Sequence, residues 1–187
     1  MKKSLGAKTI LFPTPVLIVC SYDANGTANA MSVAWGGIAC SEPPAVSISV
    51  RDHRKTYENI MLKKAFTVNI PSEKHIKEAD HFGIYSGKTE DKFKATGLTP
   101  VKSDLVDAPY IKEFPLVMEC ELMESHKLGT HTQFIGKIKD VKVEESSLNP
   151  KGFPDVGNMK PFAFDPSTSA YYAVGKFLGQ AYSIGKK

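Results

Sequence analysis

The chain lacks the short motifs that identify the common nucleotide, metal and hydrolase sites. No GxGxxG segment follows a predicted strand and no Walker loop occurs, so neither a Rossmann dinucleotide site nor a P-loop is expected. The cysteines form no CxxC pair and no zinc-ligand spacing, and no GxSxG motif indicates a hydrolase. His75 and His81 lie six residues apart on one predicted helix, facing different sides, so we expect no shared metal.

Long hydrophobic runs are also absent. No apolar run approaches the roughly 18 residues that a membrane-spanning helix needs, so no membrane contact is expected. The apolar stretch after Lys2 and Lys3 resembles a signal peptide, but Pro13 and Pro15 interrupt it and no small-residue cleavage site follows. We therefore expect a cytoplasmic protein.

Cysteine is scarce and charge is nearly balanced. Three scattered cysteines indicate a reducing compartment, and their apolar, strand-like contexts predict buried free thiols at Cys20, Cys40 and Cys120. The net charge of +4 is small, and the lysines are scattered without interleaved aromatic residues, so nucleic acid is not an expected partner. The length suits a single domain over residues 1–187.

Short runs rich in Val and Ile predict mostly strands. We expect strands at residues 16–22, 45–50, 65–70, 116–122, 132–143 and 170–174. Helices are expected at residues 54–64, with Asp52 as N-cap, and at residues 72–85, capped by Ser72. Residues 86–115 are expected to be irregular, and residues 149–169 to form a long proline-rich loop. Strands and helices do not alternate regularly, which favours a mainly β fold with inserted helices, an antiparallel barrel closed or half closed.

Residues 27–37 carry small, hydroxyl and amide side chains where a strand usually carries bulk. The segment follows a predicted strand and an Asn25-Gly26 turn. A backbone without large side chains allows a flat, polar molecule to approach closely. Ser49, Arg51 and Thr56 then add hydroxyls and positive charge. Together the two segments predict a site for a planar, phosphorylated cofactor.

A mononucleotide flavin matches these side chains. Its phosphate needs hydroxyls, N–H groups and cations, for which Ser49, Arg51 and Thr56 are candidates. Thr56 falls in the first turn of a predicted helix, where free N–H groups and the helix dipole favour an anion. Asn29 is a candidate for bonding the ring or the ribityl chain, and Trp35 offers a broad apolar surface. The lack of an adenine-pyrophosphate motif favours FMN over FAD.

Several segments together resemble the flavin reductase-like proteins, which have an FMN-binding split barrel. The segments are residues 29–35, 47–50, 54–60 and 129–136, and they stand in the order seen in that family. Within it, the chain is most similar to the flavoredoxins, FMN-carrying electron-transfer proteins. The resemblance implies an antiparallel split β-barrel and a homodimer with FMN near the subunit interface. It places FMN-binding residues at Asn29, Trp35, Thr56, Lys92, His131 and Phe164.

The family's Gly-Asp-His segment lies near the flavin and the nicotinamide, but here Thr130 replaces the Asp. His131 still matches, whereas a catalytic role carried over from that Asp does not transfer. No catalytic residue is assigned. Each of the six residues also has a structural alternative. Asn29 is also typical of a hairpin, Trp35 of a core, and Thr56 of a helix start. Lys92 is also typical of a protein surface, His131 of a buried structural histidine, and Phe164 of an apolar residue that packs under the proline-rich loop.

Three functions are compatible with these patterns. The leading hypothesis is an FMN-binding redox protein that transfers electrons between a reduced donor and an acceptor protein. The second is an NAD(P)H-dependent flavin reductase, suggested by His131, because the same fold hosts that activity. The third is a flavin-binding module without redox turnover.

Overall fold

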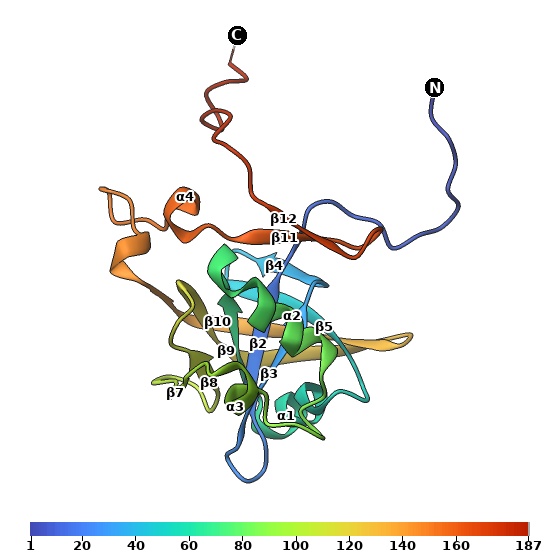
Figure 1. The fold of residues 1–187 in the computed structure, drawn as a ribbon, viewed down its shortest axis with the longest axis vertical. Coiled ribbons are helices and arrows are strands. Elements are labelled where there is room, and N and C mark those ends of the chain that lie inside the picture. The colour runs from blue at the N-terminus through green and yellow to red at the C-terminus, as the bar shows by residue number, and fades with distance from the viewer. Residues whose placement is uncertain (187) are drawn as a thin grey trace.

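The protein is built around one antiparallel sheet (Figure 1). The computed structural model describes residues 1–186. The seven strands of the sheet follow the order β3-β2-β6-β9-β10-β5-β4. Their bounds are Ala28–Val33, Leu17–Tyr22, Ala65–Ile70, Leu116–Leu128, His131–Val143, Ala45–Arg51 and Gly36–Cys40. The two ends of the sheet approach each other where the Ser49 N–H donates to the Trp35 carbonyl at 2.8 Å. The predicted antiparallel split barrel is thus confirmed.

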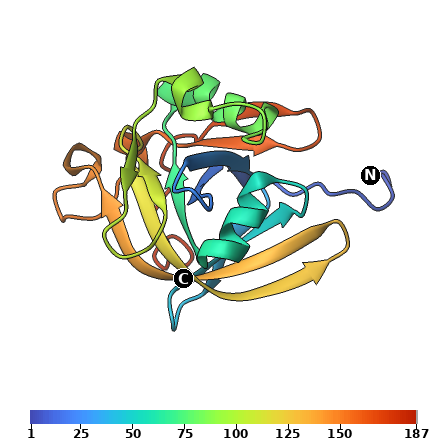
Figure 2. The same ribbon diagram turned by 90° about the horizontal axis from the view of Figure 1, so that it is seen from below.

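Smaller elements cover the ends and the outside of this barrel. A three-stranded sheet joins β1 (Thr14–Pro15), β11 (Phe162–Asp165) and β12 (Ala170–Ala173), and β7 (Pro100–Lys102) pairs with β8 (Pro109–Ile111). The helices are α1 (Lys55–Lys63), α2 (Ile76–Ile84), α3 (Lys92–Thr96) and α4 (Val156–Met159). Short 3₁₀ turns occupy Glu73–His75 and Glu145–Ser147. Seen from below, α1 lies across the lower end of the barrel, and α2 and α3 lie outside it (Figure 2).

The core has two parts, one on each face of β2. Val19 packs with Phe66 and Phe134 inside the barrel, under α1. Ile18 points to the other face and packs with Phe82 of α2 and the other side chains of the outer cluster. Because β2 is covered on both faces, it reads in the sequence as a continuous apolar run instead of an alternating pattern.

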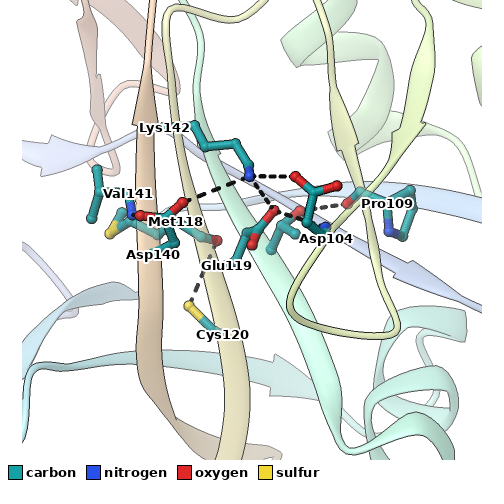
Figure 3. Close-up of polar contacts among 9 residues, drawn as sticks. Asp104, Pro109, Met118, Glu119, Cys120, Asp140, Val141 and Lys142 are labelled. Carbon is teal, nitrogen blue, oxygen red and sulfur yellow. Dashed lines mark hydrogen bonds and ion pairs between the residues drawn. The ribbon is translucent and has the colours of Figure 1, made fainter.

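A buried carboxylate lies where β9 and β10 pair below the loop between β7 and β8. Glu119 is fully buried, and Lys142 Nζ lies 3.2 Å from its carboxylate, 2.8 Å from Asp104 and 3.6 Å from Asp140 (Figure 3). The ammonium of Lys142 is therefore the counter-charge of an acid that water does not reach.

The strand predictions are largely confirmed. β6 has the predicted bounds, and β9 and β10 form the predicted long pair with Gly129 at the turn, where its φ is 54°. β9 continues to Leu128, six residues beyond the predicted end. Its last residues are mostly exposed, and they extend the strand by pairing with β10.

Neither predicted cap makes a side-chain cap bond: Asp52 is not the N-cap of α1, and Ser72 is the N-cap only of the 3₁₀ turn before α2. Arg54 is the N-cap of α1 and makes no side-chain cap bond. The Asp52 carboxylate instead accepts hydrogen bonds from Lys127 and from Thr132 Oγ1, on the β9–β10 hairpin. Ser72 likewise makes no cap bond, and α2 begins only at Ile76 after a 3₁₀ turn.

Three further expectations need correction. Residues 86–115 are not simply irregular, because they include α3 and the β7–β8 pair, and residues 149–169 include α4 and β11. Cys20 and Cys120 are buried, but Cys40 is exposed because it ends β4, an edge strand.

Within residues 1–186, no helix is long and apolar enough to cross a membrane, and no group of metal-ligating side chains occurs there.

Candidate functional site

Three adjoining hollows follow β3. The helix-start hollow lies beside the first turn of α1, the arginine hollow beside the end of β5, and the apolar hollow beside β11 and β12. Met31 and Arg54 border the first two, and Ser32, Val33 and Ala34 border the last two. The small residues of β3 therefore form the shared floor of one elongated site.

In the helix-start hollow, β3 and α1 are joined by a buried side-chain hydrogen bond. Asn29 Nδ2 donates to Thr56 Oγ1 at 2.9 Å, and both side chains are buried. The loop after α2 lies directly against this pair, since a Cβ on Gly87 would come within 1.8 Å of Asn29 Oδ1. Only glycine allows such a close backbone approach, so residue 87 fixes one wall of the hollow.

The first turn of α1 presents free donors to this hollow. The N–H groups of Lys55 and Thr56 have no acceptor within residues 1–186, and Arg54 supplies no cap. Such groups, together with the helix dipole, attract an anion. Lys55 also lines the hollow, although its ammonium pairs with Asp23 at 3.0 Å.

Lys92, the first residue of α3, places a buried ammonium at the same point. Only 4% of Lys92 is exposed, and its Nζ donates to the carbonyls of Phe82 at 3.2 Å and Tyr85 at 3.3 Å. No carboxylate in the described chain pairs with this ammonium. Burial lowers the pKa of Lys92 to about 8, and repulsion from Arg54 and Lys55 contributes.

Cys20 does not act as the missing counter-charge. Burial raises the pKa of the Cys20 thiol to about 12, so this thiol is neutral at physiological pH. The helix-start hollow thus gathers cations and free N–H groups without an anion. Its free volume is about 10 Å³, and the flexible side chains of Arg54 and Lys55 line it.

The arginine hollow has a volume of about 190 Å³ and contains four of the predicted site residues. Trp35, 37% exposed, lies at its edge, and Ser49, Arg51 and His131 line it. His131 is the cross-strand neighbour of Arg51. Burial, followed by repulsion from Arg51, lowers the pKa of His131 below its usual value, so its ring is neutral at physiological pH.

The apolar hollow, about 180 Å³ in volume, lies at the other end of the β3 floor. The rings of Phe164 and Tyr171 line it, with centroids 5.6 Å apart. The Tyr171 hydroxyl donates to Asp80 at 2.9 Å, which fixes the ring at the hollow's edge. One end of the site is therefore cationic and the other aromatic.

A family model named flavin reductase like domain matches residues 9–163. The chain belongs to this family. It is 49% identical to the flavoredoxin of Desulfovibrio vulgaris (Miyazaki F), with all of both chains covered and a TM-score of 0.96. It is 29% identical to a flavoredoxin from Methanosarcina acetivorans, with 100% of this chain and 98% of that one covered and a TM-score of 0.91. It is also 30% identical to an uncharacterized protein of Pyrococcus abyssi over 74% of this chain and 79% of that protein.

In this member of the flavin reductase-like family, the predicted site residues fall into three neighbouring groups. Asn29, Thr56 and Lys92 meet in the helix-start hollow, Trp35, Ser49, Arg51 and His131 in the arginine hollow, and Phe164 in the apolar hollow. Ser49 and Arg51, predicted to share a phosphate with Thr56, lie in a different hollow from Thr56. Lys92 is buried, so it is not a surface lysine. Trp35 is 37% exposed and lies at a hollow, so it is not a core tryptophan.

The wall formed by Ser86 and Gly87 and the Tyr171 ring were not predicted as parts of the site. Ser86 and Gly87 stand in a stretch that was expected to be irregular. A Ser-Gly pair directly after a helix is the one signal that indicates a close backbone approach there. Tyr171 offered no signal, because its place depends on the pairing of β12 with β11.

Proposed function

We propose that this protein binds FMN and transfers electrons between a reduced donor and an acceptor protein. The observation that carries the proposal is the buried, unpaired ammonium of Lys92 beside the free N–H groups at the start of α1. Burying a cation without an anion is unfavourable, and a phosphate would supply the missing charge. Membership of the family and the likeness to flavoredoxins support flavin as the molecule that carries it.

The chemistry of the site fits FMN. Lys92, Thr56 and the N–H groups of Lys55 and Thr56 would hold its phosphate. Small residues of β3 leave room for a planar ring, and the aromatic side chains of Phe164 and Tyr171 suit the ring's dimethylbenzene end. The sequence carries no adenine-pyrophosphate motif, which favours FMN over FAD.

When bound, FMN would supply the electron chemistry itself. The protein's part would be to hold the ring, exclude water from its apolar end, and place Trp35 and His131 at its open side. Electron transfer needs no acid–base pair, so no catalytic residue is assigned.

We further propose a cytoplasmic homodimer. Both ends of the chain extend away from the barrel (Figure 1) and expose apolar side chains, among them Phe12, Phe177 and Leu178 at 56, 80 and 85%. Extended apolar arms of this kind are usually covered by a second subunit. Sedimentation velocity of the full chain should give twice the monomer mass, whereas a monomer at micromolar concentration would reject the dimer.

The cofactor is tested with the purified full chain. It should be yellow, or should take up one FMN per chain when FMN is added. Replacing Lys92 by Met removes the ammonium and should weaken FMN binding by roughly tenfold or more, since charge-assisted hydrogen bonds are worth about 1.5–3 kcal/mol. Lys94→Met, an exposed position on the same helix, is the matched control and should bind FMN normally. A colourless wild-type protein that binds no FMN would rule the proposal out.

An NAD(P)H-dependent flavin reductase is the second candidate, because His131 and Trp35 share a hollow beside the ring site. Rapid oxidation of NADH or NADPH with free flavin would favour this reductase. Reduction of the bound flavin by a low-potential protein, without use of NAD(P)H, would favour the electron carrier. A flavin that no donor reduces at a useful rate would leave the third hypothesis, a flavin-binding module without turnover.

A further inference from the structure

The loop between α2 and α3, residues 85–91, forms one wall of the helix-start hollow. Its first three residues line that hollow, and the loop runs past the start of α1 (Figure 1). The Ser86 carbonyl accepts the N–H groups of Thr89 and Glu90, both at 3.1 Å, so the loop is a compact turn. The position of this turn therefore decides the shape of the hollow.

The same loop holds the buried ammonium of the site. Lys92 Nζ donates to the Tyr85 carbonyl at 3.3 Å and to the Phe82 carbonyl at 3.2 Å. The Phe82 carbonyl belongs to α2, whereas the Tyr85 carbonyl belongs to the loop. A shift of Tyr85 would therefore move the ammonium that the proposed function assigns to the phosphate.

His81 holds Tyr85 from behind the hollow. It lies in the last turn of α2 and does not line the hollow itself. Its ring stacks on the Tyr85 ring, with centroids 4.4 Å apart and planes inclined by 35°. Its carbonyl accepts the Tyr85 N–H at 3.1 Å. Rings stacked in this way attract each other beyond the effect of the apolar area that they bury, so His81 fixes where Tyr85 lies.

The His81 ring also reaches the other end of the loop. Its Nε2 lies 3.2 Å from the Glu90 carboxylate, and both side chains are less than a third exposed. Nε2 makes no aligned hydrogen bond within residues 1–186, so this contact adds attraction when the ring is protonated, while the stack sets the geometry. The ion pair of Lys88 with Glu58 of α1 also tethers the loop, but it is exposed and contributes little.

We propose that His81 is a positioning residue that gives the site its preference for phosphorylated over unphosphorylated flavin. It acts through Tyr85, whose carbonyl orients the Lys92 ammonium, and through the loop that walls the hollow. The inference rests on the proposed function, because it takes the helix-start hollow as the place of the FMN phosphate.

Titrations of the flavin-free full chain with FMN and with riboflavin test this role. His81→Ala removes the stack and the contact with Glu90 together, and it should weaken FMN binding on the order of fivefold, the net effect of about one hydrogen bond. Riboflavin has no phosphate, so its affinity should stay within about twofold of the wild-type value. His81→Phe keeps an aromatic ring on Tyr85 and should recover most of the FMN affinity.

His75→Ala is the matched control. His75 lies at the other end of α2, and its ring contacts the Phe114 ring with centroids 5.3 Å apart, away from the residues that line the hollow. This variant should bind both flavins as the wild type does. His81→Leu keeps bulk without a polar ring, and it replaces His81→Ala in the comparison should that variant not fold.

A double variant tests whether His81 acts through Lys92. His81→Ala combined with Lys92→Met should bind FMN no more weakly than Lys92→Met alone, because the ammonium that His81 positions is already gone. Losses that add would show that His81 does not act through this ammonium.

Two further results would overturn the inference. Equal weakening of FMN and riboflavin binding by His81→Ala would show a general structural role, and unchanged FMN affinity would show no role. Both results leave the proposed function standing, since the wild type still binds FMN. Failure of the wild type to take up FMN would instead contradict the proposed function, and the inference with it.

Discussion

At the scale of single residues, Lys92 is the most informative side chain of the site. Burial of its ammonium, with a smaller contribution from repulsion by Arg54 and Lys55, lowers its pKa to about 8. The folded protein therefore holds this proton less tightly than the unfolded chain, whose lysine has a pKa of 10.5. A protein tolerates such a group where a ligand compensates it, and strongly shifted pKa values are enriched at functional sites.

The shifted pKa predicts how FMN binding depends on pH. Below pH 8 the free protein already carries the proton on Lys92, so FMN binds at full strength. As the pH rises above about 8, the free protein loses that proton and must regain it to bind the phosphate, so the dissociation constant should increase. Fluorescence titrations of FMN between pH 6.5 and 9.5 would measure this.

The Lys92→Met variant provides the control for this pH dependence. It should bind FMN weakly, with a dissociation constant that is flat over the same pH range. A wild-type dissociation constant that does not change up to pH 9.5 would show that Lys92 does not contact the phosphate.

The structure brings some of the predicted site residues together and separates others. Asn29, Thr56 and Lys92 are brought together from β3, α1 and α3, as the family resemblance implied. The placement of Arg51 apart from Thr56 was not predictable, because a strand end and the following helix turn point their side chains in different directions. The failure of Asp52 as a cap has a similar cause: its carboxylate is taken by Lys127, which is 75 residues away in sequence.

At the scale of elements, all six predicted strands are present, but β1, β3, β4, β7, β8 and β11 were not predicted. In β6, Phe66, Val68 and Ile70 face the cluster inside the barrel, so the alternation of these apolar residues was sufficient to locate the strand. Its other face carries Thr67 and Asn69, which are buried and hydrogen-bonded. β1 pairs with β11 from the opposite end of the chain, whereas β7 and β8 are a local pair of three residues each, and each begins with a proline. A local pattern does not encode a distant partner, and strands of three residues with proline carry little strand signal, so these strands were placed within loops.

The β9–β10 pair contains the clearest stability prediction. Lys142 pairs with Glu119, whose carboxylate is fully buried (Figure 3). Lys142→Met should lower the free energy of unfolding by about 3 kcal/mol, because it leaves a buried carboxylate without its counter-charge. Urea denaturation monitored by circular dichroism would measure the loss.

Two variants give this measurement its controls. Lys139→Met removes only an exposed ion pair with Glu121 and should cost less than about 1 kcal/mol. Adding Glu119→Gln to Lys142→Met should restore part of the lost stability, since the uncompensated charge is gone. Equal losses for Lys142→Met and Lys139→Met would show that Lys142 does not stabilise the buried acid.

At the scale of the whole molecule, the half-closed barrel determines where the site lies. The ends of the sheet meet through Ser49 and Trp35, so β3 faces β5 across the opening. α1 and α3 close one end of this opening with positive charge, and β11 and β12 close the other with aromatic rings. An elongated site with one cationic, anion-binding end and one apolar end follows from that arrangement, and FMN has the complementary asymmetry.

The central claim is that the helix-start hollow binds the phosphate of FMN, and riboflavin, which lacks only that phosphate, tests it most directly. Equilibrium titration of the flavin-free wild-type protein with both molecules, and of Lys92→Met with both, gives four dissociation constants. We expect the wild type to bind FMN at least about a hundredfold more tightly than riboflavin, because several charge-assisted hydrogen bonds depend on the phosphate. Most of that preference should disappear in Lys92→Met. Equal affinity of the wild type for FMN and riboflavin would contradict the account.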